Sequence, residues 1–328
     1  MRTAITGSVA TDHLMSFPGR FNDSLMAEQL HNVSLSFLVD DLQIRRGGVA
    51  ANICFGMGVL GGNPLLVAAV GHDFDDYRLW LEKHGVDCSE VHTSATAHTA
   101  RFMCTTDNEQ NQIASFYPGA MSESSELDMA VIAKRVGGLE LVLIGADDPD
   151  AMIKHTNSCR DQGIDFIADP SQQLPRLNGD QTRAVVEGAK YLFNNEYESQ
   201  LIEQRTGWSE NEVLENVGVR VTTLGKNGVR ITSIDGTDIY VPVAQEKSIK
   251  DPTGVGDAFR AGFIMGLEWG QSLKHSAQIG SLLATYVIET IGTQEFTLSK
   301  SGFLDRLGRA YGKDSAKAIR DKLVCHHD

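Results

Sequence analysis

The stretch DPTGVGDAFRAGFIMGLEWG, Asp251–Gly270, joins a glycine-containing turn to an almost wholly apolar segment. The residues that follow Asp257 are apolar on nearly every side of a helix, which predicts a helix buried in a large core. A carboxylate in the first turn of such a helix is costly to bury unless it is paired or accepts hydrogen bonds. The backbone amides of residues 254–257 would be unpaired first-turn donors beside the positive end of the helix dipole. The stretch therefore suits an anion held at a helix N-terminus next to a catalytic base.

In a simpler interpretation, Asp257 has a structural role and no catalytic one. An acid in the first turn favours the helix dipole, and it could pair with Arg260 three residues later. The local sequence does not decide between these two interpretations.

Length and composition favour one large α/β domain. The chain has 328 residues, of which 41% are hydrophobic, so it can bury a sizeable core. A formal net charge of −14 disfavours binding to nucleic acid or to an anionic membrane, because both need clustered cations. The five cysteines form no C-x-x-C pair, and neither a signal peptide nor an apolar run of about 18 residues is present. We expect a reduced, soluble, cytoplasmic protein.

The second half of the chain alternates strand-like and helical patterns, which predicts a mostly parallel sheet with helices on both faces. The expected strands are 141–144, 164–168, 191–193 and 219–223, and an earlier strand is expected at 3–9. Residues 229–234 and 239–243, joined at Asp235-Gly236, predict an antiparallel hairpin at one edge. Everything after Gly254 is predicted to be helical.

Three further segments interrupt this alternation and predict a small separate sheet. Residues 33–44 alternate apolar and polar side chains in their first half, as a half-exposed strand would, and 99–105 with 112–117 predict a hairpin. We therefore expect one domain, 1–328, in which 12–46 and 98–119 are inserted β segments that form a lid. Phe102 and Phe116, one on each arm of the hairpin, could stack on a planar ligand or could form its apolar core.

Familiar phosphate-binding loops are absent. Residues 56–61, GMGVLG, match the dinucleotide fingerprint in form, but they lie inside a helical pattern that begins at Val49 rather than directly after a strand. Close helix packing explains these small residues better. No Walker A sequence, G-x-S-x-G elbow or HExxH spacing occurs.

Four motifs in order resemble the ribokinase-like (PfkB) carbohydrate kinase family over essentially the whole chain. They are GGVAAN at 47–52, Asn195-Glu196-Tyr197-Glu198 (N-x-x-E), 223–228 (T-x-G-x-x-G) and the DPTGVGDAFRAG stretch from Asp251. The chain looks closest to adenosine kinases of the actinobacterial type. Pro252, Val255 and Cys54 depart from the usual family residues, and none of them removes a functional side chain. The resemblance implies a three-layer α/β/α domain with a central, mostly parallel sheet and a small β-sheet lid.

The resemblance also implies a role for each matching residue. Asp257 would be the general base, and the amides of Gly254, Val255 and Gly256 would form the anion hole. The residues expected to bind the substrate are Ser8, Asp12, Gly48, Asn52, Phe102, Phe116, Gln172, Gln173 and Arg176. The residues expected to contact ATP are Asn195, Thr223, Gly225 and Gly228, with Glu198 organising Mg²⁺ through water. Many family members also use a K⁺ ion near the anion hole.

The activity implied is transfer of the ATP γ-phosphate to the 5′-hydroxyl of adenosine, giving AMP and ADP in purine salvage. Two alternatives remain open: a kinase for ribose, inosine, guanosine or another ribosyl compound, and a non-catalytic purine-binding protein. The expected partners are adenosine and ATP, with no nucleic acid and no membrane. Related enzymes are often dimers, and the β lid offers a surface for association, so we expect a homodimer that forms through the lid.

Overall fold

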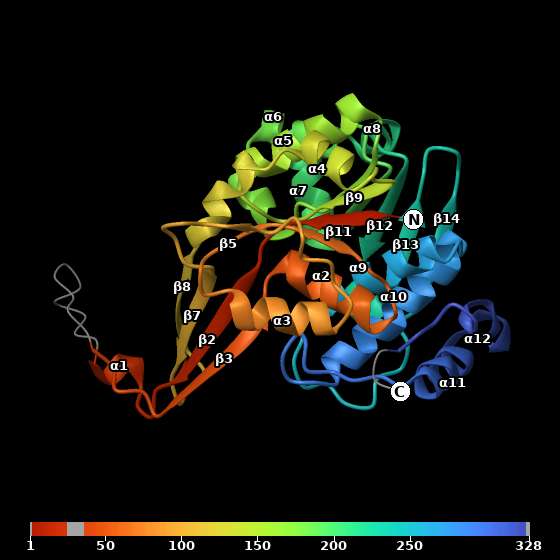
Figure 1. Ribbon diagram of the computed structural model, residues 1–328. Helices are drawn as coiled ribbons and strands as arrows, with labels where there is room; N and C mark the ends of the chain where they lie inside the picture. The colour runs from red at the N-terminus through yellow and green to blue at the C-terminus, as the bar shows by residue number, and fades with distance from the viewer. Residues whose placement is uncertain (1, 25–35, 326–328) are drawn as a thin grey trace.

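A central eight-stranded sheet forms the middle layer of the computed structural model, which describes residues 2–24 and 36–325 (Figure 1). The strands lie in the order β14-β13-β12-β11-β10-β9-β1-β4. Their bounds are β1 Thr3–Thr6, β4 Leu65–Val67, β9 Leu141–Ile144, β10 Asp165–Ala168, β11 Tyr191–Asn195, β12 Val219–Thr223, β13 Val229–Thr232 and β14 Asp238–Val241. The pairs from β4 to β12 are parallel, and β12, β13 and β14 pair antiparallel. The parallel sheet and the edge hairpin predicted from the sequence are confirmed.

Helices cover both faces of this sheet. On one side lie α4 (Met129–Arg135), α5 (Pro149–Gln162), α6 (Gly179–Val186), α7 (Glu196–Thr206) and α8 (Glu210–Asn216) (Figure 1). On the other side lie α2 (Val49–Val59), α3 (Asp75–Lys83), α9 (Val255–Glu268), α10 (Leu273–Ile288), α11 (Lys300–Tyr311) and α12 (Lys313–Ile319). The shorter elements are α1 (Phe21–Ser24), β5 (Ala69–Val70), β6 (His92–Thr93), and the 3-10 helices η2 (Gly119–Glu126), η3 (Ser171–Arg176) and η4 (Gly225–Asn227).

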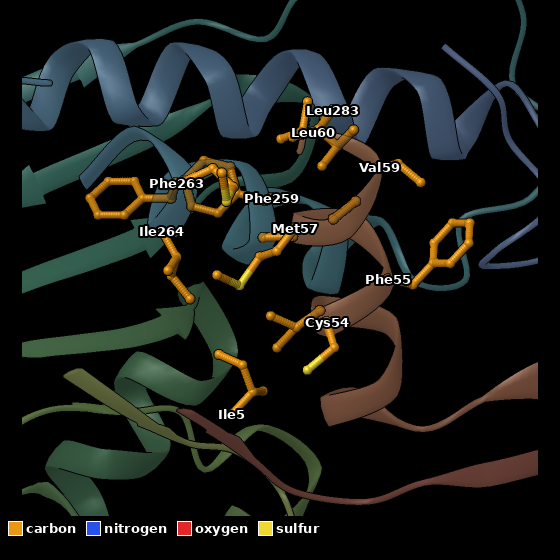
Figure 2. Packing of buried hydrophobic residues seen from close by; sticks show 14 of the residues in the cluster. Ile5, Cys54, Phe55, Met57, Val59, Leu60, Phe259, Phe263, Ile264 and Leu283 are labelled. Atoms are coloured by element: carbon orange, nitrogen blue, oxygen red, sulfur yellow. The ribbon is translucent and has the colours of Figure 1, made fainter. Parts of the chain in front are cut away.

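The strand period of two residues divides the buried side chains into two cores. Ile5 faces the core formed with α2, α9 and α10, and its neighbour Ala4 faces the opposite core under α4 to α8. Figure 2 shows Ile5 of β1, Met57 of α2 and Ile264 of α9, which all belong to the first core. Because the central strands are buried on both faces, they have the continuous apolar sequences expected of a parallel sheet.

A second sheet of four strands extends from the main body as the lid (Figure 1). Its order is β3-β2-β7-β8, with β2 at Ala10–Ser16, β3 at Asp41–Gly47, β7 at Ala100–Thr106 and β8 at Gln112–Tyr117. The predicted strand at 33–44 is wrong for 36–40, which form no strand, and 33–35 lie outside the described residues. Residues 25–35 of the expected 12–46 lid segment also lie outside them. Asp12 sits within the lid strand β2.

The glycine-rich sequence at 56–61 belongs to α2 and the turn that follows it. A Cβ atom on Gly56 would fall 2.7 Å from the Ala261 Cβ, and one on Gly58 would fall 1.9 Å from the His84 carbonyl oxygen. These glycines let α2 pack closely against its neighbours, so the rejection of a dinucleotide loop is confirmed. Among the described residues, no helix combines the length and apolarity needed to cross a bilayer.

Candidate active site

Two cavities meet at the N-terminus of α9, beyond the carboxyl ends of the parallel strands. The first, of about 640 Å³, lies between the lid and the main sheet. The second, of about 460 Å³, lies beside the ends of β11 and β12. Both cavities are lined by Gln172, Gly256 and Asp257. In open α/β sheets this edge is where ligands gather.

The turn that begins α9 presents its backbone toward both cavities. Gly254 is the N-cap with φ of 75°, and a Cβ atom there would fall 2.7 Å from Cγ2 of Thr293. The Val255 amide donates to the Pro252 carbonyl at 3.4 Å, and the Val255 side chain packs against the core. The Gly256 and Asp257 amides lie in the first helical turn, where no intrahelical acceptor exists for them. This turn can therefore offer amides to an anion, as the sequence suggested.

Asp257 is a half-buried carboxylate at the junction of the two cavities. Burial raises its pKa from an ordinary 3.8 to about 7, opposed by a hydrogen bond from Asn52 and by the charge of Arg260. The Asn52 Nδ2 donates to Asp257 Oδ2 at 2.8 Å. Arg260 forms its ion pair with Asp169 instead, so the simpler interpretation of Asp257 as its partner is wrong. A carboxylate with a pKa near neutrality suits a general base.

The Arg260–Asp169 pair lies beneath the anion-hole turn. One Arg260 nitrogen donates to Asp169 Oδ1 at 2.7 Å, and another donates to the Gly256 carbonyl at 3.1 Å. Both side chains are buried, and Arg260 also lines the second cavity. The pair therefore braces the turn and places a cation beside the second cavity.

At the other end of the first cavity, Asp12 faces the interior from β2. Burial raises its pKa to about 6, opposed by the charge of Arg45 on the neighbouring strand β3. Gly48 has φ of 96°, and a Cβ there would fall 2.6 Å from the Ser8 carbonyl oxygen. The Ser8 hydroxyl accepts a hydrogen bond from the Val49 amide at 3.1 Å. Ser8 and Gly48 thus shape the start of α2 as well as lining the cavity.

The lid contributes two aromatic side chains to the same cavity. Phe102 on β7 pairs in register with Phe116 on β8 and with Asp12 on β2, so all three project from one face of the lid. Both rings line the cavity, and Phe116 is 43% exposed. Their alternative interpretation as the apolar core of a hairpin is wrong. From the facing side, η3 brings Gln172, Gln173 and Arg176 to the cavity.

The second cavity is lined by the start of α7. Asn195 caps this helix by accepting from the Glu198 amide at 2.8 Å, and Glu198 accepts from the Asn195 amide at 2.8 Å in return. Burial raises the pKa of Glu198. Thr223, at the end of β12, lines the same cavity.

Comparison with known proteins supplies the family. The description "pfkB family carbohydrate kinase" matches residues 9–300. The chain belongs to this family. A nucleoside kinase from Methanocaldococcus jannaschii is 30% identical over 76% of this chain and 80% of its own. An adenosine kinase from Saccharomyces cerevisiae is 25% identical over 87% of this chain and 91% of its own.

Solved structures of family members agree with the architecture. Burkholderia thailandensis nucleoside kinase in complex with inosine superposes with a TM-score of 0.81, at 33% identity over 94% of this chain and 98% of that one. The same protein has been solved in complex with ADP-inosine, with a TM-score of 0.80, 33% identity, and 94% of this chain and 96% of that one covered. The ribokinase-like fold expected from the motifs is therefore confirmed.

Within this pfkB-family fold, most of the expected site residues line the two cavities. Val255, Gly225 and Gly228 line neither, and the Val255 side chain packs against the core instead. Both glycines lie in the turn that follows Thr223, which lines the second cavity. A Cβ on Gly228 would fall 2.2 Å from the Val241 carbonyl oxygen, whereas a Cβ on Gly225 would meet open space. Arg45 and Thr293 also line the first cavity, from β3 and from the loop after α10, and neither was predicted from the sequence. Neither belongs to a recognisable motif, so only the tertiary structure reveals them.

Proposed function

We propose that this pfkB-family kinase transfers the γ-phosphate of ATP to the 5′-hydroxyl of a purine nucleoside, with adenosine as the leading acceptor. The observation that carries the proposal is the junction of two cavities at Asp257 and Gly256. A two-substrate phosphotransferase needs two neighbouring sites with a base and an anion hole between them. A protein that only binds purines needs neither the second cavity nor a base.

The first cavity is the proposed acceptor site. Phe102 and Phe116 would hold a planar base, and Gln172, Gln173 and Arg176 would contact its edge. Asp12, a carboxylate acceptor, suits the vicinal ribose hydroxyls. The 5′-hydroxyl would then lie beside Asp257, which takes its proton as the new P–O bond forms.

The second cavity is the proposed ATP site. Asn195 and Thr223 line it, and the Gly254–Gly256 turn would receive the γ-phosphate. Among residues 2–24 and 36–325, no three His, Cys, Asp or Glu side chains gather closely enough to hold a metal ion. Mg²⁺ would therefore be held mainly by phosphate oxygens and water, with Glu198 accepting from that water. This donor set fits Mg²⁺, which would neutralise charge on the transferring phosphoryl group.

Inosine is a second candidate acceptor, because the Burkholderia thailandensis relative was solved with it. Adenine presents an amine and a ring acceptor where hypoxanthine presents a carbonyl and a ring N–H. A glutamine amide offers both a donor and an acceptor, so Gln172 and Gln173 could serve either base by turning over. The proposed site thus favours purine nucleosides as a class, with adenosine and inosine compared directly.

The decisive test is an acceptor panel with purified protein. ADP release would be followed with adenosine, inosine, guanosine, cytidine, ribose and fructose, each with Mg²⁺ and with either K⁺ or Na⁺. We expect the highest kcat/KM with adenosine, little turnover of free sugars, and faster rates in K⁺. Faster turnover of ribose or fructose than of every nucleoside would refute the nucleoside assignment, and no turnover of any acceptor would favour a binding protein.

A further inference from the structure

A chain of hydrogen bonds runs from Trp80 on α3 to the carboxylate of Asp257. The Trp80 Nε1 donates to Gln294 Oε1 at 3.1 Å. The Gln294 Nε2 donates to Asn52 Oδ1 at 2.9 Å, and the Asn52 Nδ2 donates to Asp257 Oδ2 at 2.8 Å. Gln294 is 1% exposed and Asn52 is 8% exposed, so water does not compete freely for these groups.

The direction of this chain is fixed at its Trp80 end. An amide group can turn over and exchange its oxygen for its nitrogen, but an indole N–H can only donate. Gln294 must therefore present its oxygen to Trp80, which leaves its nitrogen for Asn52. Asn52 must in turn present its oxygen to Gln294, which leaves its nitrogen for Asp257. The indole thus determines that a donor, rather than an acceptor, faces the carboxylate.

Tyr77 fixes the same direction independently. Its hydroxyl donates to the Gly47 carbonyl at 2.9 Å, so its single proton is already used. It can then only accept from Gln294, whose Nε2 lies 2.6 Å away. Both constraints turn the nitrogen of Gln294 toward Asn52.

Packing holds the indole in place. The Trp80 ring stacks on Phe55 at 5.9 Å between centroids with an interplanar angle of 8°. The guanidinium of Arg46 lies 4.3 Å above the Trp80 ring. The donor end of the chain is therefore anchored by Phe55, which lines neither cavity, and by Arg46, which also lines the first cavity.

We propose that Trp80, Tyr77 and Gln294 are positioning residues that compel Asn52 to present a hydrogen-bond donor to Asp257 and so hold it in the ionised form that accepts a proton. The proposal rests on the proposed function, in which Asp257 is the base. A reversed Asn52 would place an amide oxygen against the carboxylate, which favours the protonated and inactive acid.

Other charged groups also act on Asp257. Arg260, on the same helix, stabilises its ionised form, and Asp169, after β10, opposes it. Glu198, at the start of α7, lies close enough to interact with Arg260. From α2 the ionisable group is Cys54, which burial keeps as a neutral thiol by raising its pKa. None of these groups is changed in the variants that test the hydrogen-bond chain.

The test compares pH profiles of kcat/KM for the best nucleoside acceptor. The double variant Trp80→Phe/Tyr77→Phe loses both constraints and adds no charge. Gln294→Glu instead reverses the orientation of the Asn52 amide, because the new carboxylate presents an oxygen to Asn52 as well as to Trp80. We expect the acid limb of both variants to move up by about one pH unit, because a hydrogen bond to the ionised form is lost. The rate would then fall about tenfold at pH 6 but stay within about threefold of wild type at pH 9. Trp208→Phe, a matched change under Arg183 and outside both cavities, should leave the profile unmoved.

Three results would overturn the proposal. Equal losses at pH 6 and pH 9 would show a structural role alone. A shift in Gln294→Glu without one in the double variant would trace the effect to the added charge. A shift of the same size in Trp208→Phe would show that the profile responds to any loss of an indole.

A second readout does not depend on turnover. The chain has three tryptophans, so three indole N–H signals can be followed by NMR in protein without nucleoside. We expect the Trp80 signal to titrate with a midpoint near the Asp257 pKa of about 7, and to lose that titration in Asp257→Asn. A Trp80 signal whose chemical shift does not change with pH would overturn the proposed role of the hydrogen-bond chain even if the kinase is active. An inactive wild-type protein with a titrating Trp80 would instead refute the proposed function and leave the role of the hydrogen-bond chain standing.

Discussion

Replacing Asp257 with asparagine should abolish most of the activity while making the protein more stable near neutral pH. Asparagine has nearly the same shape, and its oxygen can still accept the hydrogen bond from Asn52. It cannot take a proton from the 5′-hydroxyl. Loss of a general base lowers kcat by about 10²–10⁴-fold, which corresponds to about 3–5 kcal/mol of barrier. The nucleoside KM should change much less, because binding contacts elsewhere in the cavity remain.

The stability change follows from the raised pKa of Asp257. Its folded-state pKa of about 7 exceeds the ordinary 3.8, so the folded protein retains a proton that the unfolded chain releases. The stability contributed by this group therefore falls as pH rises through that window, by about 1.4 kcal/mol per pH unit. Above pH 7 the accumulated cost is at most about 4 kcal/mol, or about 6 °C in Tm for a chain of this length. Asp257→Asn removes this cost.

The prediction is checked by thermal unfolding at pH 5 and pH 8 together with steady-state kinetics. We expect the variant to melt above wild type at pH 8, and the gain to shrink to about 1–2 kcal/mol at pH 5. Asp12 and Asp147, whose pKa values burial also raises, are present in both proteins, so their contributions cancel in the difference. A kcat within tenfold of wild type would refute the base assignment. An equal Tm change at both pH values would refute the account of its burial.

Three further changes probe the cavities and the lid. Phe102→Ala should raise the nucleoside KM about tenfold, because the loss of one base–aromatic stack costs about 1–3 kcal/mol. The turnover of ribose, which has no base, should not change. Steady-state kinetics with both acceptors test this prediction. Glu198→Gln keeps the reciprocal cap of α7, because glutamine serves that role equally, so the Tm should change little. The variant removes the negative charge of Glu198, so the Mg²⁺ concentration needed for the half-maximal rate should rise several-fold. Ile44 is 60% exposed on the lid face opposite Asp12 and Phe102, and we expect it to lie in a homodimer interface. Ile44→Glu should therefore give a monomer when the mass is measured by light scattering. A mass equal to that of the wild type would exclude this face as the interface.

The central sheet could be predicted because its strands are buried on both faces. Leu141–Ile144 and Tyr191–Phe193 are uninterrupted apolar runs, and turns or helices separate them from the next element. The edge hairpin was equally clear from Asp235-Gly236 between two β-type segments. Local sequence and tertiary structure agree at these positions.

The lid strands could not be located in the same way. In β2, the residues after Ala10 are mostly half-buried, and in β3 all residues before Arg45 are exposed. One face of these strands borders the ligand cavity and carries polar groups such as Asp12, so β2 shows no alternation of apolar and polar residues. In β3, Leu42 and Ile44 do alternate with polar residues, but both are exposed, so this alternation marks no buried face. Their stability comes from pairing with one another, which the local sequence does not encode. This is why 33–44 was misplaced and β2 was missed.

The candidate site likewise contains residues that the local sequence predicts and residues that it does not. Asp257 and the Gly254 turn could be predicted because helix-start chemistry is local to the sequence. The Asn195–Glu198 motif is also local, and a capping box alone would account for it; its second role follows only from its place beside the second cavity. Gln294 has no local pattern at all, because its partners lie more than 200 residues away in the sequence.

The raised pKa values show where the fold gives up stability. Asp12 and Asp257 line the acceptor cavity, and burial moves both toward neutrality at a cost in folding free energy. Acids of the outer surface, such as Asp235, accept several hydrogen bonds and are shifted the other way, to a pKa of about 2. A bound nucleoside would offer hydroxyl donors to both cavity carboxylates and stabilise their charged forms. The energy that these groups cost the free protein is thus recovered on binding, which couples the fit of the ribose to the ionisation of the base.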